Sequence, residues 1–297
     1  MISQRKVCLR KLGRLFSLIV AKLFQFLPWK INFWLARFLT FLWLDVLGIR
    51  REVIADNIRK VFPLISDEDL NRMRRHSMIS LCRSFFDVIK IPYLNDDWIE
   101  KNVIFEGAGI EPLKSEKNGV FFLSLHIGSG DLAAAIASRK LKPVTIISKR
   151  FKNECLDEFW FSLRGRSQTE FINAHAKNNA FEILSALKKK RGVAFVLDQF
   201  MGKPYGVETK FFGFTTGTAY GLAVFVKKTE RPVYPLYTFW DENHKLHLCV
   251  DEPVDLKDYI SENNEVITER FNRVLEKIIL THPQHWMWVH KRWKTFE

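Results

Sequence analysis

The sequence predicts an α/β fold in which a largely parallel, mixed sheet is flanked by helices. From residue 103 onward, short apolar runs rich in β-branched and aromatic residues alternate with helical patterns, and this alternation is typical of βαβ units. The runs are as short as buried strands, and turn-forming or polar residues bound them. With 297 residues, of which 47% are hydrophobic, the chain is long enough to bury one large core.

The first segment, residues 1–49, is predicted to form basic, amphipathic helices that associate with a membrane. Its two apolar stretches, 12–28 and 31–49, are each interrupted by charged residues, so neither is an uncharged span of ~20 residues. Residues 1–60 hold 12 Lys or Arg and 3 acidic residues, a net charge of +9 out of the chain's +13. Cationic apolar helices favour an anionic membrane surface. A helical hairpin packed on a soluble core is the alternative.

We expect these helices to lie on the bilayer, with Trp29, Trp34 and Trp43 at headgroup level. A cleavable signal peptide is not indicated, because no small-residue cleavage site precedes Pro28. Nucleic acid is the other partner that a basic chain suggests. Since no helix-turn-helix, zinc-finger or RNA-binding aromatic motif accompanies the charge, we expect no nucleic-acid partner.

Residues 50–297 are predicted to form one domain, in which residues 50–92 are a helical lead-in and residues 103–297 are the α/β core. In the lead-in, Ser66 is expected to cap a helix, with Asp69 at the capping-box position. The strands predicted in the core are residues 120–125, 144–148, 193–197 and 233–239, with 246–250 as an antiparallel edge strand. Helices are predicted over residues 132–137, 219–228 and 265–280.

The strongest functional signal is the strand that ends at His126. Residues 120–125 have the pattern of a strand buried on both faces, and the Ala-rich segment after Asp131 favours a helix. The turn between them lies at the carboxyl end of a strand, where α/β sheets tend to bind ligands. There an acid can fix the tautomer of an imidazole, and Gly128 and Gly130 let a substrate approach the backbone. We predict a catalytic His126 oriented by Asp131; a satisfied core histidine is the alternative.

A second histidine, His247, has the same spacing to an acid, Glu252. The residues around His247 alternate between polar and apolar like a half-solvated strand, without glycines or a following helix. We interpret this pair as structural.

Two further polar residues are expected at the same sheet edge as His126. Asp198 directly follows the predicted strand 193–197, and Gln199 comes next. Parallel strands end at one edge of a sheet, so both are candidates for contact with the substrate. A strand-end carboxylate that only caps a loop is the alternative for Asp198.

Two segments near the C-terminus have an anion-binding composition. Residues 212–218, which include Gly213, precede a predicted helix and could receive an anion at its N-terminus, although a plain capped helix fits equally well. Residues 286–293, which include Arg292, are dense in aromatic and cationic side chains. Packing in the wall of an acyl groove, binding of lipid phosphate and sealing of the core all agree with that composition.

Several other chemistries lack their motifs. The 4 Cys are scattered, so neither a zinc site nor a disulfide framework is predicted. Gly128-Ser129-Gly130 does not form the G-x-S-x-G nucleophile elbow. Neither a dinucleotide fingerprint nor a phosphate-binding P-loop is found. We expect no metal and no cofactor.

The pattern of His126, four residues and Asp131 at a strand end resembles the signature of the glycerolipid acyltransferase superfamily. Further blocks resemble one branch of it, the late (secondary) acyltransferases of bacterial lipid A biosynthesis. These blocks are residues 50–63, 211–213, 231–235 and 283–293. The branch usually has Glu where this chain has Asp131, which is the acid of the wider superfamily.

This resemblance implies an acyltransferase with a glycerolipid acyltransferase-like fold on the cytoplasmic face of the bacterial inner membrane. It implies that His126 is the general base that deprotonates a lipid hydroxyl as this attacks an acyl thioester. The implied donor is acyl carrier protein, with coenzyme A left open, and the acceptor is a hydroxyacyl chain on a lipid A precursor. Arg164 becomes a candidate for binding substrate phosphate, and Asp198 gains support as a site residue.

Two alternatives stay open at this point. The same chemistry could serve another membrane lipid, such as a lysophospholipid, an aminolipid or a glycolipid. Outside enzymology, the chain could be a membrane lipid-binding protein in which His126 is inert.

Overall fold

The computed structural model describes residues 2–297, with side chains placed from residue 11 onward except at residues 14 and 25. In this part of the chain, seven strands form one sheet in the order β1-β9-β8-β2-β5-β3-β4, and β6 and β7 form a separate hairpin. Within the sheet every neighbouring pair is parallel apart from β8 and β9. The predicted α/β fold with a largely parallel, mixed sheet is therefore confirmed.

The elements follow the predicted order along the chain. The strands are β1 (Val103–Glu106), β2 (Val120–Ser124), β3 (Val144–Ser148), β4 (Glu170–Asn173), β5 (Gly192–Val196), β6 (Gly206–Phe211), β7 (Phe214–Ala219), β8 (Val233–Trp240) and β9 (Leu246–Val250). The longer helices are α1 (Ile2–Gln25), α2 (Lys30–Phe41), α3 (Arg51–Val61), α4 (Asp67–Lys90), α7 (Gly130–Lys140), α8 (Glu154–Arg164), α9 (Asn179–Lys188), α10 (Gly221–Thr229) and α11 (Asn264–Thr281). The short helical segments are η1 (Leu42–Val46), η2 (Ile91–Tyr93), α5 (Asp96–Asn102), α6 (Ile110–Ser115) and η3 (Pro283–His285).

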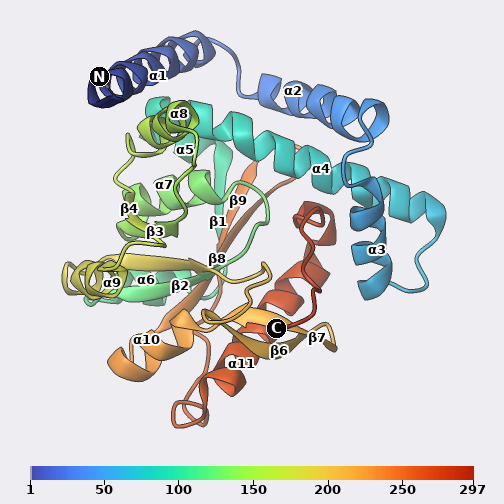
Figure 1. Cartoon of the computed structure of the whole chain (residues 1–297), viewed down its shortest axis with the longest axis vertical. Helices are drawn as coiled ribbons and strands as arrows, with labels where there is room; N and C mark the ends of the chain where they lie inside the picture. The colour runs from blue at the N-terminus through green and yellow to red at the C-terminus, as the bar shows by residue number, and fades with distance from the viewer. Residues whose placement is uncertain (1) are drawn as a thin grey trace.

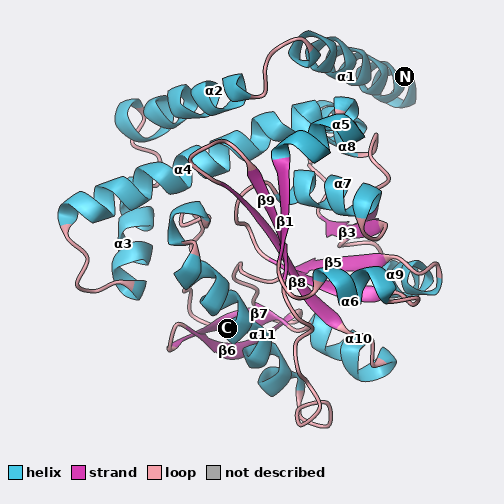
Figure 2. Cartoon of the chain, turned by 180° about the vertical axis from the view of Figure 1, so that it is seen from behind, coloured by secondary structure: helices cyan, strands magenta, loops and turns pink. Residues whose placement is uncertain are grey.

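The central strand β2 contributes side chains to two cores. Phe121 and Leu123 pack in the core that includes α9, α10 and α11. Val120 and Phe122 pack in the core that includes α7. Because successive side chains of a strand lie on opposite faces, an apolar run without polar residues predicts burial on both faces, and Figures 1 and 2 show helices on both sides of the sheet.

The edge of the sheet differs from the prediction. β9 is antiparallel to β8 as expected, but it is not the edge strand. β1 pairs with it in parallel, from Val103 beside Leu246 to Glu106 beside Cys249. Neither β1 nor β4 was predicted, because each has only four residues and lacks a long apolar run.

In the helical lead-in, α4 begins directly after its predicted N-cap residue, Ser66. The Ser66 hydroxyl accepts a hydrogen bond from the Asp69 amide at 3.1 Å, which satisfies one of the free amides of the first helical turn.

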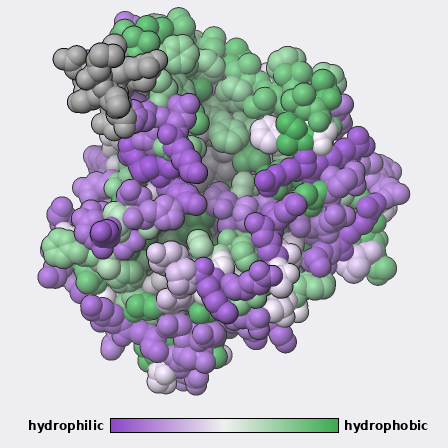
Figure 3. Space-filling view, in the orientation of Figure 1, coloured by the Kyte–Doolittle hydropathy of each residue, from purple (hydrophilic) through white to green (hydrophobic). Residues whose placement is uncertain are grey.

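The two N-terminal helices pack on the body of the molecule by one part of their surface. α1 runs along α8, and α2 runs along α4 (Figure 1). Other positions on both helices expose large apolar side chains: Leu12, Leu15, Phe16, Ile19, Leu23, Phe26, Trp34, Phe38 and Phe41. Figure 3 shows hydrophobic side chains gathered over this end of the molecule.

Among the described residues, no single helix has the length and apolar character that crossing a bilayer requires. The segments Lys30–Val46 and Arg51–Val61 pass the same test as a pair, although the chain bends by 98° between them.

The anion-binding loop considered for residues 212–218 is not a loop. Most of it forms β7, which pairs with β6 in an antiparallel hairpin. α10 begins only at Gly221, so the hairpin rather than a helix N-terminus occupies this segment.

Candidate active site

His126 lies on the tight turn that joins β2 to α7. The turn is held on both sides: the amide of Gly128 donates to the carbonyl of His285 at 3.3 Å, and the amide of Ser129 donates to Thr238 Oγ1 at 3.1 Å. Gly128 has a φ of +58°, and a Cβ atom there would lie 2.0 Å from the carbonyl oxygen of Thr238. Glycine is therefore required at this position, both by its backbone conformation and by the close approach of β8.

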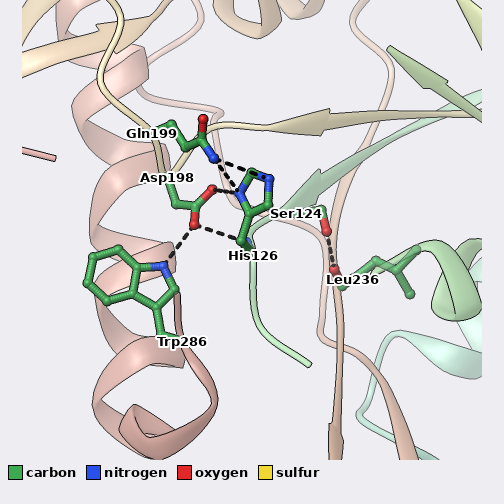
Figure 4. Close-up of polar contacts among 6 residues, drawn as sticks. All are labelled: Ser124, His126, Asp198, Gln199, Leu236 and Trp286. Carbon is green, nitrogen blue, oxygen red and sulfur yellow. Dashed lines mark hydrogen bonds and ion pairs between the residues drawn. The ribbon is translucent and has the colours of Figure 1, made fainter. Parts of the chain in front are cut away.

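The register of the sheet brings Asp198 to His126. β5 pairs in parallel with β2, with Val196 beside Ser124, so the residues just beyond the two strand ends meet. Asp198 Oδ1 lies 2.8 Å from His126 Nδ1. Asp198 Oδ2 accepts the backbone amide of His126 at 2.9 Å and the indole N–H of Trp286 at 2.8 Å (Figure 4).

These contacts fix the charge of the acid. Burial alone would raise the pKa of Asp198, but the charge and hydrogen bonds of His126, together with the Trp286 indole, outweigh it and lower the pKa to about 2. The side chain of Asp198 is 1% exposed, whereas that of His126 is 41% exposed. Asp198 is therefore a buried carboxylate with hydrogen bonds to both oxygens, and it lies behind an imidazole that is partly exposed to solvent.

The same carboxylate sets the protonation of His126. Burial would lower the pKa of the imidazole, but the charge and hydrogen bond of Asp198, aided by the charge of Asp131, raise it above the ordinary value of 6.5. A carboxylate can only accept a hydrogen bond, so the proton of the neutral ring is on Nδ1. Nε2 is left unprotonated, so its lone pair can accept a proton, as a general base requires.

Gln199, the residue after the acid, also lies against the imidazole. Its Nε2 atom is 3.4 Å from each ring nitrogen of His126. It therefore lies beside the lone pair of Nε2, where a substrate hydroxyl would arrive.

The structure corrects the predicted role of Asp131. Its carboxylate forms an ion pair with Arg164, with Asp131 Oδ1 2.6 Å from Arg164 Nε, and Asp198 takes the place next to the imidazole. The reason is topological: β5 is the direct neighbour of β2, whereas Asp131 lies on the first turn of α7, where it meets Arg164 at the end of α8. Asp131 acts on His126 only through its charge.

Arg164 is held by more than this ion pair. Its Nη1 atom donates to Ser148 Oγ at 3.2 Å, and its guanidinium lies over the rings of Phe171 and Phe161, at 4.2 and 4.9 Å from their centroids. The side chain is 7% exposed. Two of the five N–H donors of Arg164 are thus committed to the protein, and the predicted contact with substrate phosphate would use the others, on Nη1 and Nη2.

The candidate residues line one cavity of about 590 Å³. Besides Gly128 and Gly130, the polar and charged residues that line it are Ser84, Ser124, His126, Asp131, Ser148, Lys149, Arg164, Gln199 and His285. Much of the remaining wall is apolar, including Phe85, Ile146, Trp160, Val196 and Met287. Gly130 leaves open space where its Cβ would stand. The arrangement combines a general base with an apolar wall, and Figure 3 shows a hollow near the middle of this face.

Two predicted site residues lie elsewhere. Arg292 is 0% exposed, and its guanidinium donates to the carbonyl of Gly217 and to Thr218 Oγ1, both at 2.6 Å. It fastens the C-terminal segment to β7 and is not among the residues that line the cavity. Gly213, with a φ of +77°, is in the turn between β6 and β7 and does not line the cavity.

Trp286 was not predicted as part of the site. It lies far from His126 in sequence, yet it donates to Asp198 and bridges Ile127 as an antiparallel β-bridge. The sequence signal was only the aromatic density of residues 286–293, which does not distinguish a core tryptophan from a site tryptophan.

Among the residues described, His, Cys, Asp and Glu side chains form no group of three that could hold a metal ion.

Comparison with known proteins gives consistent matches. The sequence model of the family "bacterial lipid A biosynthesis acyltransferase" matches residues 3–295. The chain is 24% identical over 251 residues to the lipid A biosynthesis palmitoleoyltransferase of Escherichia coli (strain K12), covering 83% of this chain and 79% of that protein. It is 21% identical over 249 residues to the lipid A biosynthesis myristoyltransferase of the same strain, covering 83% and 75%. It is 22% identical over 242 residues to lipid A biosynthesis acyltransferase 2 of Shigella flexneri, covering 80% and 76%.

A solved structure is also similar. The 1-acyl-sn-glycerophosphate acyltransferase PlsC from Thermotoga maritima superposes with a TM-score of 0.41 at 15% identity, over 90% of this chain and 100% of that one.

Proposed function

Because this chain belongs to the bacterial lipid A biosynthesis acyltransferase family, we propose that it transfers a fatty acyl chain from an acyl thioester to a hydroxyl of a lipid A precursor. The chain is an acyltransferase, as its relatives are named. The observation that carries the proposed mechanism is the His126–Asp198 pair, which presents an unprotonated imidazole nitrogen in a cavity with an apolar wall.

In this mechanism His126 Nε2 removes the proton from the acceptor hydroxyl as its oxygen attacks the thioester carbonyl. The resulting imidazolium is stabilised by the ionised Asp198, which keeps its own charge because its pKa is about 2. When the tetrahedral intermediate collapses, the C–S bond breaks and the imidazolium returns its proton to the leaving thiolate. A positioned base of this kind supplies a rate enhancement of ~10²- to 10⁴-fold, without an acyl-enzyme.

The oxyanion of that intermediate has a natural place at the start of α7. The first amides of a helix have no partner within the helix, and negative charge is favoured at a helix N-terminus. Gly130 and Asp131, the first residues of α7, both line the cavity. Gly130 leaves this approach open because it has no side chain.

The donor that we propose is an acyl carrier protein thioester, with the acyl chain held against the apolar wall of the cavity. The carrier is acidic, and this chain has a net charge of +13, so charge complementarity favours the encounter. Coenzyme A is the competing donor, and it would present the same thioester without the acidic protein surface.

We propose that α1 and α2 lie on the cytoplasmic leaflet of the bacterial inner membrane. Their exposed apolar side chains, among them Phe16, Phe26, Trp34 and Phe38, provide the surface that enters the interface, and Lys11, Lys22 and Arg37 supply charge for anionic headgroups. This side holds the activated acyl donors that the reaction needs.

The test is mass spectrometry of purified protein incubated with an acyl carrier protein pool and a tetraacylated lipid A precursor. His126→Ala is the test variant and His247→Ala is its matched control, since His247 Nδ1 also lies 2.8 Å from a carboxylate, that of Glu106, outside the cavity. A product heavier by one acyl group, lost only in His126→Ala, supports the proposal. If other membrane lipids are acylated instead, the lipid A precursor is not the acceptor. If no acceptor receives an acyl group, the result favours a lipid-binding protein.

A further inference from the structure

A second cavity adjoins the active site on the far side of His285. Its volume is about 490 Å³, and α2, α4 and the turn between β8 and β9 enclose it. His285 lines both cavities. The residues that carry positive charge or can acquire it here are Arg37, His76, Arg83, His244 and His285.

Arg83 is the key residue of this cavity, because it is buried without a carboxylate in hydrogen-bond contact, although the charges of Asp87 and Asp241 act on it. The residue is 3% exposed. The structure describes no hydrogen bond or ion pair of its guanidinium, and the buried Nε atom has no acceptor. The guanidinium instead lies over the indole of Trp240, 3.4 Å from the ring centroid. Buried charges are normally paired, so an unpaired guanidinium held in place at a cavity indicates that its anion comes from outside.

The nearby carboxylate of Asp87 is committed to other groups. It is 0% exposed and accepts the side-chain amide of Asn32 at 2.9 Å, the indole N–H of Trp240 at 3.1 Å and the hydroxyl of Ser129. It therefore fixes Trp240, on which Arg83 is stacked, rather than bonding to the guanidinium.

The two acidic residues that line the cavity, Asp241 and Glu242, make no hydrogen bond or ion pair to Arg83 that the structure describes. Asp241 accepts the backbone amide of Lys245 at 2.7 Å and also pairs with His247, and Glu242 is an exposed residue at the rim. Arg37, on α2, has no ion-pair partner among the described residues, and it lies near the ring of Trp34, at 5.5 Å.

The histidines that line the cavity are held in their neutral form. Burial, then neighbouring cationic groups, lower the pKa of His76 and of His244 and lower that of His285 to about 4. Neutral at physiological pH, these imidazoles can donate hydrogen bonds to an anion.

We propose that this cavity binds a phosphate monoester, with the Arg83 guanidinium as its buried anchor and Arg37 at its mouth. This assignment rests on the proposed function: the phosphate belongs to the headgroup of the lipid acceptor. Arg37 shares α2 with the exposed Trp34 and Phe38, so the mouth of the cavity lies beside the surface assigned to the bilayer. A guanidinium matches phosphate geometry with two parallel hydrogen bonds. A headgroup anchored there would hold its acyl chains beside His126, across His285.

The first test measures binding without turnover. Inorganic phosphate is titrated into the full-length His126→Ala protein by calorimetry, with and without Arg83→Gln. Glutamine keeps one neutral donor, so the change removes about one charge-assisted bond and should weaken binding by about 10- to 100-fold. The matched control is Arg75→Gln, on the same helix, since Arg75 is already paired with Asp45 on the surface. Equal phosphate binding in the Arg83→Gln and Arg75→Gln proteins would overturn the proposal.

The second test identifies the source of the phosphate. With otherwise wild-type enzyme, Arg83→Gln should raise KM for the phosphorylated acceptor by about 10- to 100-fold, with kcat little changed and the dephosphorylated acceptor unaffected. The headgroup assignment would be overturned if Arg83→Gln changed KM equally for the phosphorylated and the dephosphorylated acceptor. If, in addition, inorganic phosphate inhibited only the wild-type enzyme, the cavity would be a site for free phosphate. If wild-type protein transfers no acyl group while Arg83-dependent phosphate binding persists, the proposed function fails and the cavity assignment stands.

A structural role for Arg83 makes the opposite stability prediction. Removing an unpaired buried charge should leave Tm unchanged or raise it. A lower Tm in a folded Arg83→Gln protein that still binds phosphate as tightly as the Arg75→Gln protein would contradict the proposal. If Arg83→Gln does not fold, Arg37→Gln replaces it, because Arg37 is exposed and should weaken phosphate binding in the same direction.

Discussion

Replacing Asp198 with asparagine should trap His126 in the wrong tautomer. Asp198 Oδ2 accepts two N–H donors, the His126 amide and the Trp286 indole. Asparagine keeps both bonds only if its oxygen takes the Oδ2 position, and its NH₂ group then faces His126 Nδ1. Because that group only donates, Nδ1 must accept and the ring proton moves to Nε2. Nε2 can then no longer take a proton from the acceptor hydroxyl.

The size of the effect follows from the same contacts. Recovering the productive tautomer requires the asparagine amide to flip, which leaves two buried N–H donors facing an NH₂ group. Each unsatisfied donor costs about 1–3 kcal/mol, so the flip costs about 2–6 kcal/mol. At 1.36 kcal/mol per factor of ten, kcat should fall by about 30- to 20,000-fold.

The assay is the initial rate of acyl transfer, measured beside the control Glu106→Gln. That control makes the same change at His247, where Glu106 Oε1 lies 2.8 Å from Nδ1, away from the cavity. We expect the control to keep the wild-type rate, and Asp198→Asn to keep its fold, since the two side chains have the same shape. A rate within about threefold of wild type for Asp198→Asn, far below the tautomer cost, would refute the assignment of Asp198 as the orienting acid.

Three further predictions concern the same site. The neutral form of His126 is the base and its pKa lies above 6.5, so kcat/KM should fall as pH drops through a value above 6.5; a flat profile from pH 8 to 6 would exclude this base. Gly128→Ala should lower the free energy of unfolding, measured by urea denaturation, by about 2 kcal/mol or more, because its Cβ would meet a carbonyl oxygen at 2.0 Å. The control is Gly130→Ala, which should change the free energy of unfolding little because the space at its Cβ is open. Asp131→Asn should destabilise by about 3 kcal/mol in the same assay, because Arg164, 7% exposed, loses its partner; an unchanged midpoint would show that the pair is dispensable.

The sequence predicted local structure well and long-range contacts poorly, for identifiable reasons. The strand before His126 and the helix after it follow from an apolar run and an Ala-rich segment, which are local signals. Which acid meets the imidazole depends on β5 being the neighbour of β2, and strand order is not encoded in the spacing between His126 and Asp131. Asp198 was placed at the right sheet edge because that inference needs only the ends of parallel strands.

The same limit explains the errors near the C-terminus. A dense group of cations and aromatics predicts either a surface site or a buried cluster, and only the packing of β7 against Arg292 decides for burial. Residues 214–219 have no clear alternation of apolar and polar residues, so the hairpin that they form with β6 had no strong local signature.

The contact between Trp286 and Asp198 has a consequence for how the protein is made. A ribosome that has reached the codon for Gln199 has already synthesised the base and its acid, but the indole that occupies the second carboxylate oxygen comes much later. Until then the Asp198 carboxylate keeps a free lone pair, and the turn around His126 lacks its β-bridge to Trp286. A nascent chain that ends before Trp286 would therefore hold His126 and Asp198 without the two contacts that fix the carboxylate and the turn.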